Sequence, residues 1–545
     1  MCSLAILTTC PVIGFGQQNV EITSSNLPII LIDTEGRSII DDPRTTARMR
    51  IIDNPGTVRN YPGDFPNNYD GMIRIEIRGK SSQMFPKKSY GFETQDERRN
   101  NLNISLLGMP EENDWILYAP YSDKSLLRNV ICFDLTRKMG WYASRTKFCE
   151  LLLNGSYRGI YVLMEKIKRD NNRVAISKLK PEDLTGDELT GGYIFSVDKM
   201  EGDYDGWYSA IDPPGSNWRT IFFQYYYPKY NVIVAEQKTY IENFVNRFEE
   251  TLNGTNFREP DTGYRKYINI NSFIDFFIIY EFAKEIDSYK FSVYMHKDKD
   301  SKGGKLTMGP VWDFNLSFGN VDFGGEGAMF PEDWMYNKGV PRMYWWNRLM
   351  EDKYFQDKLK VRWSDLRKEI FDTDSIMNFI DTQTLYIEEA RKRNFQCWPV
   401  IGQYIWPNFY VGDSYEDEMN YLKDWIRDRL DWMDDNMPGE ITSTGDETSI
   451  SETKTFPVVT YPNPLLSGNK FTFTIDYPQQ IYLDIYNILG QKIITIIDPA
   501  KNRDTHRIDW TARDRNGYML PNGLYLFSVK SYTTQIAKGK IIIMR

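Results

Sequence analysis

The sequence predicts an α+β body followed by a small all-β domain, and three observations support this. Between residues 18 and 436, apolar residues recur with both helical and strand spacing. Residues 437–457 are polar and rich in Ser, Thr and Glu, which is typical of a linker. Residues 458–545 then alternate with period two in short segments separated by turn residues, the pattern of an Ig-like β-sandwich.

Residues 1–17 are expected to be a secretory signal peptide. The run CSLAILTTCPVIGFG after Met1 is apolar and short, and it ends in small residues before Gln17. This is the pattern of a hydrophobic region followed by a cleavage zone, although a buried first strand is the alternative. No other run approaches the ~18 apolar residues of a membrane span, so we expect no transmembrane segment.

The composition limits the classes of function. Hydrophobic residues make up 41% and aromatic residues 15% of the chain, which supports large packed cores rather than disorder. The net charge of -9 argues against a general nucleic-acid binder. The two histidines, His296 and His506, are too few for a His-rich zinc site and make a Ser-His-Asp triad unlikely to be the chemistry here. The three cysteines beyond the signal, Cys132, Cys149 and Cys397, form no disulfide framework and are expected to be buried.

The first part of the body alternates between strand and helix patterns. Residues 74–79 and 87–94 are expected to be strands joined by a short loop. Residues 124–140 show helical spacing and end in glycine, which predicts a helix. Residues 148–167 form two apolar runs around Asn154-Gly155, a strong hairpin signal.

The second part of the body is predicted to contain one more hairpin and many helices. Residues 271–287 are strongly apolar and are expected to form a helix. Two strands, 289–298 and 303–314, are expected around a turn of small and charged residues. Residues 345–436 are Trp-rich and predicted to be helical.

Two acids carry the main chemical hypothesis. Asp287 is expected to end the helix, and Asp313 to end the second strand of the hairpin. Antiparallel pairing around the turn would place residues whose numbers sum to about 602 opposite each other, so the two acids should lie within about two residues of each other. One could hold Mg²⁺ while the other orients a hydroxyl, which is the layout of protein kinases. A simple turn is the alternative for Asp313, because Asp favours turns.

A phosphoryl-transfer site also needs groups that hold phosphates. Gly79, Ser81 and Ser82 lie in the loop between two expected strands. Backbone amides of such a loop can approach phosphate oxygens closely. An ordinary hairpin loop is the alternative.

Basic residues follow that loop. Lys88 shares a strand face with the apolar residues after it, so it is favoured over Lys87 as the phosphate lysine. Glu165, at the end of an apolar strand, could pair with this lysine, although such pairs are often simple surface salt bridges. Arg128 on the predicted helix is a further candidate.

The body resembles the CotH kinase family. The resemblance covers roughly residues 25–435 and rests on IEIRGKSSQMFPKKSYGFET, DWILYAPYSDKSLLRN, FCELLLNGSYRGIYVLMEKIKRDNNRVAI, GGYIFSVDK, EIDSYKFSVYM, GPVWDFNLSFGN and RNFQCWPVIGQYIWPN. This family resembles a minimal, atypical protein kinase, which implies a kinase-like body that uses ATP with Mg²⁺ or Mn²⁺. By this resemblance, Asp287 matches the catalytic acid and Asp313 the metal-binding acid.

One departure from the family concerns the metal site. Family members often carry an Asn a few residues after the first acid, whereas this chain has Ser292 in that region. The hydroxyl of Ser292 is a weaker ligand, and Asn315 could supply a carbonyl oxygen instead.

The tail resembles the C-terminal sorting domain of the type IX secretion system. The matching features are YPNP, IYNILGQKI, the pattern W-x-x-x-D-x-x-G from Trp510 to Gly517, NGLYLFSV and the final GKIIIMR. The resemblance implies export through the periplasm and outer membrane, with the type IX machinery as a partner. The protein would then be attached to the cell surface or released, and a generic Ig-like module is the alternative.

These observations lead to two main hypotheses of different classes. The first is an exported kinase that transfers the ATP γ-phosphate to Ser or Thr hydroxyls of secreted or surface proteins. The second is a catalytically weak or inactive cell-surface adhesin on the same frame. A glycan hydrolase with two carboxylates is a weaker third possibility, because it gives Lys88 no role.

Overall fold

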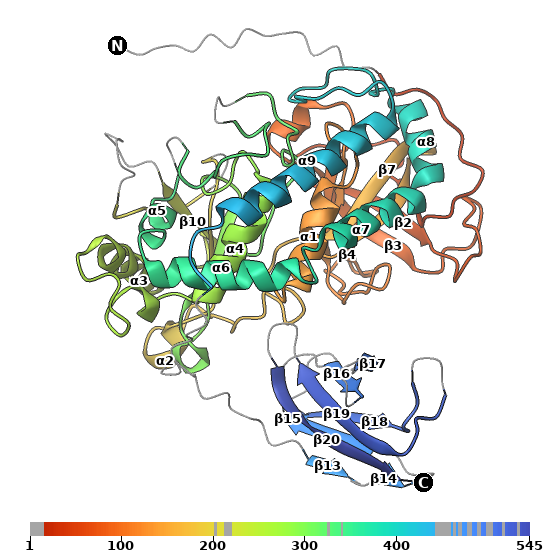
Figure 1. Cartoon of the computed structure of the whole chain (residues 1–545). Coiled ribbons are helices and arrows are strands. Elements are labelled where there is room, and N and C mark those ends of the chain that lie inside the picture. The colour runs from red at the N-terminus through yellow and green to blue at the C-terminus, as the bar shows by residue number, and fades with distance from the viewer. Residues whose placement is uncertain are drawn as a thin grey trace, which may run out of the picture. The chain divides into compact units, whose positions relative to one another are not determined.

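The computed structural model divides into two compact units, with the boundary after Ile441, and each is described here by itself (Figure 1). Most of the predicted signal peptide and most of the predicted linker lie outside the described residues. The structure describes residues 16–200, 204–211, 221–323, 327–338 and 342–441 of the body, and 459–461, 465–466, 471–476, 482–487, 492–497, 505–514, 518–530 and 535–544 of the tail.

The first half of the body is a closed seven-stranded barrel. Its strand order is β1-β2-β3-β4-β5-β7-β6, and the parallel pair β1–β6 closes the ring. The predicted hairpin around Asn154-Gly155 is confirmed as β6 and β7, and the predicted strands 74–79 and 87–94 fall in β3 and β4. The bounds are β1 (Ile29–Asp33), β2 (Thr45–Ile52), β3 (Tyr69–Arg78), β4 (Ser89–Gln95), β5 (Asp114–Tyr118), β6 (Thr146–Leu153) and β7 (Ser156–Glu165).

Alternate side chains of these strands fill the barrel. Ile73 and Ile75 on β3 point to the same interior as Tyr90 and Phe92 on β4, and Trp115 on β5 is fully buried among them. One face of each strand is therefore apolar, as period-two alternation requires. Closing the ring also removes the exposed strand edges that an open sheet would leave.

The second half of the body is a five-stranded antiparallel sheet with helices around it. Its order is β12-β11-β8-β10-β9. The strands are β8 (Tyr193–Val197), β9 (Gly206–Tyr208), β10 (Phe222–Tyr227), β11 (Val293–Lys297) and β12 (Leu306–Met308). Pairing of Met295 with Met308 confirms the predicted hairpin and lies within one residue of the expected register.

Two predicted bounds in this region are wrong, and each has a local reason. The helix expected over 271–287 is α4 (Ile270–Ala283), which ends because Lys284 adopts a left-handed conformation with φ of 46°. The second strand ends at Met308, since Gly309 also has a positive φ and Pro310 offers no amide hydrogen. Asp287 and Asp313 therefore both lie in loops rather than at element ends.

Helices cover much of the body. The predicted helix 124–140 is confirmed as α1, and α4 packs against α6 and α9 (Figure 1). Twelve of the fourteen residues of α4 are buried, as expected for a helix that is apolar nearly all round. The remaining helices are α1 (Arg128–Lys138), α2 (Gly186–Leu189), α3 (Ala235–Asn253), α5 (Trp345–Leu349), α6 (Lys353–Arg367), α7 (Thr373–Tyr386), α8 (Glu388–Cys397) and α9 (Tyr415–Asn436).

The tail forms two sheets, and its predicted strands are confirmed. The described core of the tail includes Trp510, whose indole Nε1 donates to the Arg513 carbonyl at 2.9 Å. Asp514 accepts the Tyr518 amide at 2.9 Å, so the W-x-x-x-D pattern builds a turn. One sheet has β13 (Val459–Tyr461), β15 (Phe471–Asp476) and β18 (Thr505–Trp510); the other has β14 (Leu465–Leu466), β16 (Tyr482–Tyr486), β17 (Lys492–Ile497), β19 (Gly523–Lys530) and β20 (Gln535–Met544).

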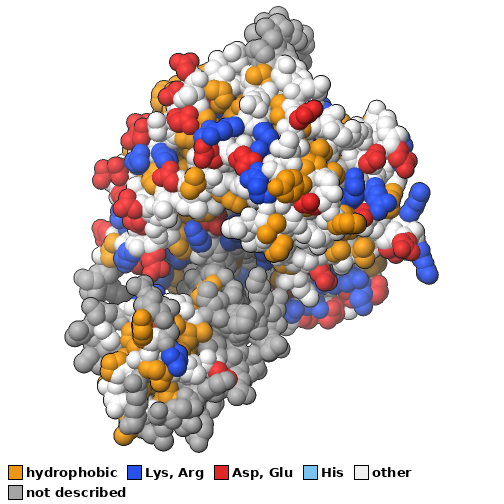
Figure 2. Space-filling view, turned by 90° about the vertical axis from the view of Figure 1, so that its right-hand side faces the viewer, with side chains coloured by type: hydrophobic (Ala, Val, Ile, Leu, Met, Phe, Trp, Pro, Cys, Tyr) orange, Lys and Arg blue, Asp and Glu red, His pale blue; other side chains and the backbone are white. Residues whose placement is uncertain are grey.

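The surface and the cysteines agree with the composition. Figure 2 shows basic and acidic side chains interspersed with small hydrophobic groups on the face turned to the viewer. Among the described helices, none combines the length and apolar character needed to cross a bilayer. The thiols of Cys132, Cys149 and Cys397 are free and buried, as predicted.

A buried ion pair joins α4 to α9. Arg429 Nη2 lies 3.2 Å from Glu281 Oε2, and both side chains are 0% exposed. The Glu281 carboxylate also accepts the backbone amides of Met335 and Tyr336, and Arg429 donates to the Asp333 carbonyl. This one cluster therefore holds two helices and the segment 327–338 together.

Arg429→Met should lower the free energy of unfolding of the body by about 3–5 kcal/mol, because it leaves the Glu281 carboxylate buried without its partner. Urea unfolding of the full chain, followed by Trp fluorescence, measures the change. Arg427 on the same helix is the matched control, since its side chain is 45% exposed and its ion pair with Asp424 lies at the surface. Arg427→Met should change the free energy by no more than about 0.5 kcal/mol; equal losses in both variants would contradict the prediction.

Candidate active site

Acidic side chains from three separate segments act on one another electrostatically in the body. Asp313 follows β12, Asp287 follows α4, and Asp198 follows β8 directly. The pKa of Asp313 is raised to about 6, first by desolvation and then by the negative charges of Asp287 and Asp198. Part of the Asp313 surface still reaches solvent, so the carboxylate is crowded yet accessible. The two acids expected to meet across the hairpin do act on one another, and Asp198 joins them.

A fourth acid lies beneath this group. Glu285 is 3% exposed, and its pKa is raised well above the usual value, first by desolvation and then by Asp287 and Asp313. Its Oε2 accepts the backbone amide of Asp287 at 2.8 Å. The Asp287 carbonyl in turn accepts the amides of Lys290 and Phe291, so Asp287 begins a tight turn. Glu285 therefore positions the Asp287 backbone from inside the body.

The Asp313 loop has an uncommon backbone held by buried polar groups. Asp313 has φ of 68°, in the left-handed region that Asp tolerates better than most residues. The next amide, of Phe314, donates to Asn129 Oδ1 on α1 at 2.8 Å. Tyr280 of α4 donates its hydroxyl to the Trp312 carbonyl at 3.0 Å and accepts the Trp312 amide at 3.1 Å. The loop is thus fixed on both sides of the carboxylate.

Basic side chains face these acids. Arg78, the last residue of β3, lies with its guanidinium 5.5 Å from the Trp312 ring centroid, and its charge acts to lower the Asp313 pKa. Lys199, next to Asp198, donates to Ser81 Oγ at 3.1 Å and lies over the Phe291 ring. Neither Arg78 nor Lys199 forms an ion pair with a carboxylate among the described residues, so both charges are available to an anion.

The loop after β3 reaches the same place. Gly79 has φ of 103°, and a Cβ there would lie 2.0 Å from Ser82 Oγ, so the tight turn requires glycine. Ser81 begins a short 3₁₀ helix, Ser81–Met84, and is tied to Lys199. Lys88 donates to the Gln83 carbonyl at 2.5 Å. These contacts place the loop beside Lys199, and Lys88 holds the loop itself.

A charged cavity of about 420 Å³ lies beside Arg78 and Gly79. Lys166 and Arg44 add positive charge to its wall, and burial lowers the pKa of Lys166. Arg44 is bound to Glu76 at 2.8 Å, whereas Lys166 lies 3.7 Å from Asp114, a loose contact. Arg78 therefore belongs both to this cavity and to the acid group.

The donor set fits a hard divalent cation only in part. Within the described ranges, no three His, Cys, Asp or Glu side chains cluster closely enough to hold a metal ion by themselves. Mg²⁺ usually takes one or two carboxylates and completes its shell with water and phosphate oxygens, so Asp313 with Asp198 or Asp287 is a sufficient protein contribution. The Ser292 hydroxyl donates to Asp313 Oδ2 at 3.3 Å, which places its oxygen beside that carboxylate.

Comparison with known proteins gives the family. The model described as CotH kinase protein matches residues 75–433, the span that holds Arg78, Asp198, Lys199, Asp287 and Asp313. The chain belongs to the CotH kinase protein family. The model described as secretion system C-terminal sorting domain matches residues 459–544, which indicates export and engagement of the secretion machinery.

Other comparisons add little about the CotH body. No curated protein matches the chain. Among solved structures, latent dimeric PorU from Porphyromonas gingivalis is 24% identical over 16% of this chain and 9% of that one, with a TM-score of 0.14. PorZ of the same organism, a surface component of the type-IX secretion system, is 20% identical over 17% and 13%, with a TM-score of 0.14. DNA-bound alkylpurine glycosylase AlkC from Pseudomonas fluorescens is 12% identical over 39% and 57%, again with a TM-score of 0.14.

Lys87 of this CotH protein lies elsewhere than predicted. Its side chain is 2% exposed, and Nζ donates to the Ile160 carbonyl at 2.7 Å and to Asn394 Oδ1 on α8 at 2.8 Å. Nζ also lies 5.1 Å from the Tyr161 ring centroid. None of these partners belongs to the acid group, so Lys87 ties the barrel to α8 rather than meeting a phosphate.

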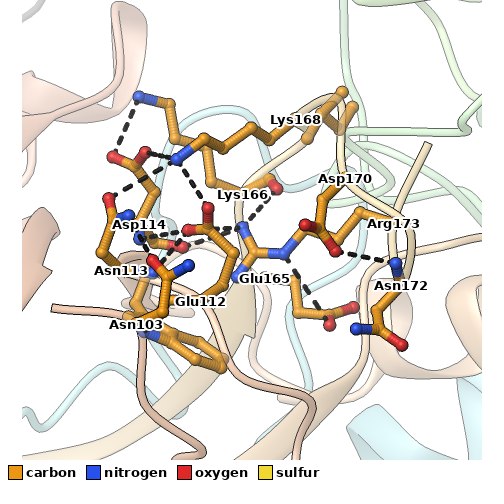
Figure 3. A network of polar contacts seen from close by, with 12 residues as sticks. Asn103, Glu112, Asn113, Asp114, Glu165, Lys166, Lys168, Asp170, Asn172 and Arg173 are labelled. Atoms are coloured by element: carbon orange, nitrogen blue, oxygen red, sulfur yellow. Dashed lines mark hydrogen bonds and ion pairs between the residues drawn. The ribbon is translucent and has the colours of Figure 1, made fainter. Parts of the chain in front are cut away.

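Glu165 does not pair with Lys88, and this expectation is wrong. It is 0% exposed at the end of β7 and binds Arg145 Nη1 at 2.8 Å, with Arg173 Nε at 3.9 Å. Figure 3 shows Arg173 between Glu165 and the chain around Glu112. The carboxylate thus belongs to a structural network under the barrel end, because arginines of neighbouring segments already satisfy it.

Arg128 is also fully engaged. It is 2% exposed, its Nη1 lies 2.6 Å from Asp123 Oδ1, and its Nε donates to the Ser317 carbonyl at 3.0 Å. These bonds leave no room for a phosphate, but they hold the stretch that follows Asp313. Asn315 lies in that stretch, and its carbonyl accepts Asn320 Nδ2 at 2.9 Å; its role as a ligand stays a prediction.

The sequence contained a signal for two residues that were missed. Arg78 and Asp198 both stand at the end of an apolar strand, β3 and β8, as Asp313 was expected to do. A charged residue at the end of a strand was counted as evidence only for Asp313 and Glu165. For Lys199, the only signal in the sequence is its position directly after Asp198.

Lys87 should give the folded protein a distinct pH dependence. Burial lowers its pKa from 10.5 to about 7. Between pH 7 and 10 the unfolded chain binds a proton that the folded chain does not, so stability rises with pH across this window. From pH 7 to 9 the wild type should gain about 1–2 kcal/mol relative to Lys87→Met, measured by urea unfolding.

The exposed Lys302 is the control for this experiment. Lys302→Met should keep the pH dependence of the wild type. A Lys87→Met variant whose stability follows the wild type in parallel from pH 6 to 9 would show that Lys87 stays protonated in the folded protein.

Proposed function

We propose that this CotH family protein is an exported protein kinase that transfers the γ-phosphate of ATP to Ser or Thr hydroxyls of secreted or surface proteins. The observation that carries the proposal is the meeting of Asp287, Asp313 and Asp198 with Arg78 and Lys199. Phosphoryl transfer needs acids that bind a cation and orient a hydroxyl, and unpaired basic groups that bind phosphate oxygens. These residues provide both. A kinase-like layout of the body is part of this proposal.

Asp313 and Asp198 would hold Mg²⁺ or Mn²⁺, with Ser292 and Asn315 as further oxygen donors. The metal supplies neutralisation of charge on the phosphate oxygens. Asp313 suits this role because desolvation, and then the charges of neighbouring acids, raise its pKa, and a cation would relieve that repulsion.

Asp287 would orient the substrate hydroxyl. As that oxygen forms its bond to the γ-phosphorus, the bond to the ADP oxygen breaks and the hydroxyl proton passes to the Asp287 carboxylate. The hydrogen bond from the Asp287 amide to Glu285 fixes the backbone position from which this carboxylate extends. Lys290 Nζ lies 3.5 Å from Asp287 Oδ1, and this contact would help to orient the carboxylate.

Arg78 and Lys199 would bind the transferring phosphoryl group. The guanidinium of Arg78 is held against Trp312, which orients it without using its donors. Amides of the Gly79-to-Ser82 loop would add neutral donors, and Lys88 would position that loop through Gln83. The sorting tail, for which we propose an Ig-like sandwich, would deliver the enzyme to proteins outside the cell.

A surface binding protein remains the second candidate, and one observation favours it. Phe65 is 93% exposed on a loop between β2 and β3. Side chains of Asn54, Asp64 and Asn67 hydrogen-bond within this loop, so the exposed ring is presented on a fixed frame. Such an exposed aromatic residue suits an adhesin as well as an enzyme.

Purified full-length protein should transfer label from γ-labelled ATP, with Mg²⁺ or Mn²⁺, to secreted proteins of its own cell. Asp287→Asn and Asp313→Asn should each lower the rate by at least about 10²-fold, because one loses the proton acceptor and the other a metal ligand. Asn tolerates the left-handed conformation of Asp313, so folding should be preserved.

Asp261→Asn, an exposed acid in another loop, is the control and should keep full activity. Other nucleoside triphosphates should be compared with ATP, since the export tail takes the protein away from cytoplasmic ATP. Absence of transfer with every nucleotide, together with an unchanged melting temperature on adding them, would refute the kinase and favour the adhesin.

Arg78→Gln should lower kcat/KM for ATP by about 10²-fold, because it removes a charge that stabilises the transition state. Arg78→Lys should restore part of the loss. Arg74→Gln is the matched control: Arg74 lies on the same strand, is 44% exposed and is paired with Glu93. Steady-state kinetics with a fixed protein substrate give the comparison, and equal effects at the two positions would remove Arg78 from the site.

A further inference from the structure

A second cavity, of about 510 Å³, lies at the other end of the strand that carries Arg78. Strand β3 runs from Tyr69 at this cavity to Arg78 at the candidate active site, ten residues or about 30 Å away. Two segments form the wall: the start of β3 with the loop before it, and the end of β4 with the loop after it. The lining residues are Pro66, Asn67, Asn68, Tyr69, Asp70, Gly71, Met72, Gln95, Asp96, Glu97, Leu102 and Ile104.

All the charged side chains that line this cavity are acidic. Asp70, Asp96 and Glu97 line the cavity, and no Lys, Arg or His does. Hydrogen bonds from Arg48 lower the pKa of Asp70, and backbone amides together with Asn100 lower that of Asp96, so both carboxylates are ionised at neutral pH. Arg48 compensates only one of the three charges.

The rest of the wall is apolar. Pro66, Tyr69, Met72, Leu102 and Ile104 contribute carbon surface beside the carboxylates. The Tyr69 ring lies against Gly71, where a Cβ would come within 2.6 Å of the hydroxyl oxygen. The cavity therefore pairs an apolar wall with an acidic one, which suits a ligand with a hydrocarbon stem and a cationic end.

The loop after β4 is fixed against the cavity wall by a buried side chain. Gln95 lines the cavity and is 3% exposed. Its Nε2 donates to the Arg99 carbonyl at 2.7 Å, while its Oε1 is itself buried and does not open into the cavity. The acidic wall beside it is therefore held in a defined position. Within the described residues, these carboxylates do not cluster closely enough to hold a metal ion.

We propose that this cavity binds a Lys or Arg side chain of an extended protein partner. The hydrocarbon stem would lie along Met72, Leu102 and Ile104. The cationic end would meet Asp70, Asp96 and Glu97. The site is separate from the candidate active site and stands whether or not the protein is a kinase.

The test uses the full chain and a fluorescein-labelled six-residue peptide of alternating Gly and Lys, followed by fluorescence anisotropy at low salt. The same peptide with Gln in place of Lys is the reference. The Lys peptide should bind and the Gln peptide should not. Asp313→Asn should leave binding unchanged, which separates this cavity from the acids of the candidate active site.

Two variants locate the binding. Glu97→Gln should weaken it about two- to fivefold, the range of an accessible ion pair, while Glu369→Gln, an exposed acid on another segment, should not. Leu102→Lys places an ammonium in the wall and should weaken binding at least about tenfold. Leu385→Lys, at a residue 72% exposed elsewhere, is its control.

Loss of binding in Leu102→Lys and not in Leu385→Lys would support the proposal. Equal binding of the Lys and Gln peptides, no binding of either, or unchanged binding in both Glu97→Gln and Leu102→Lys would overturn it. Weaker binding in Asp313→Asn with no change in Leu102→Lys would assign the peptide to the other site and overturn it as well.

Discussion

Repulsion between carboxylates is the interaction that the loops of the candidate active site must withstand. Desolvation and then the charges of Asp287 and Asp198 raise the pKa of Asp313 to about 6, and the pKa of Glu285 beneath them is raised well above its usual value. Loops carrying such charges would move apart if they were free. They are held because each neighbouring peptide group has a buried partner: Asn129 and Tyr280 for the Asp313 loop, and Glu285 for the Asp287 loop. Because these hydrogen bonds keep the loops from separating, a bound cation would relieve the repulsion between the carboxylates. This is the physical reason for preferring a function that depends on a cation.

The buried ion pairs around this site fix the positions of backbone segments more than they stabilise the fold. Glu281 has a raised pKa and Arg429 a pKa lowered to about 10, in both cases first by desolvation. Each group is therefore pushed toward its neutral form by burial more than it is stabilised by its partner. Yet each bond of the cluster ends on a backbone group of the segment 327–338 or on α4. Arg128 does the same for the chain after Asp313 through the Ser317 carbonyl. Apolar side chains would pack as well, but they would not select one backbone conformation.

Local patterns in the sequence predicted local structure, and non-local geometry decided the rest. The hairpin at Asn154-Gly155 and the alternation of the tail strands depend on neighbouring residues, so they could be predicted. Closure of the barrel depends on β1 meeting β6, two strands more than a hundred residues apart, and no local pattern encodes it. The strand-face argument that favoured Lys88 over Lys87 failed for a similar reason. Both lysines precede the first paired residue of β4, Ser89, so strand alternation does not govern them. Asn394, from a distant helix, decides where Lys87 points.

Barrel closure also explains how one strand can serve two sites. An isolated hairpin would let its ends fray, but β3 pairs with β2 over residues 69–75 and with β4 over residues 72–78, so each of its residues has a paired neighbour. Its interior residues are packed against the barrel core, so the strand acts as a rigid element rather than as a flexible connection. Arg78 at one end and Tyr69 at the other are therefore held at a fixed separation of about 30 Å. A partner bound by a basic side chain at the Tyr69 end could reach the acids near Arg78 only with an extended segment of about nine residues or more, at ~3.3 Å per residue. Any coupling between the two sites would then come from the length of the partner rather than from movement of the barrel.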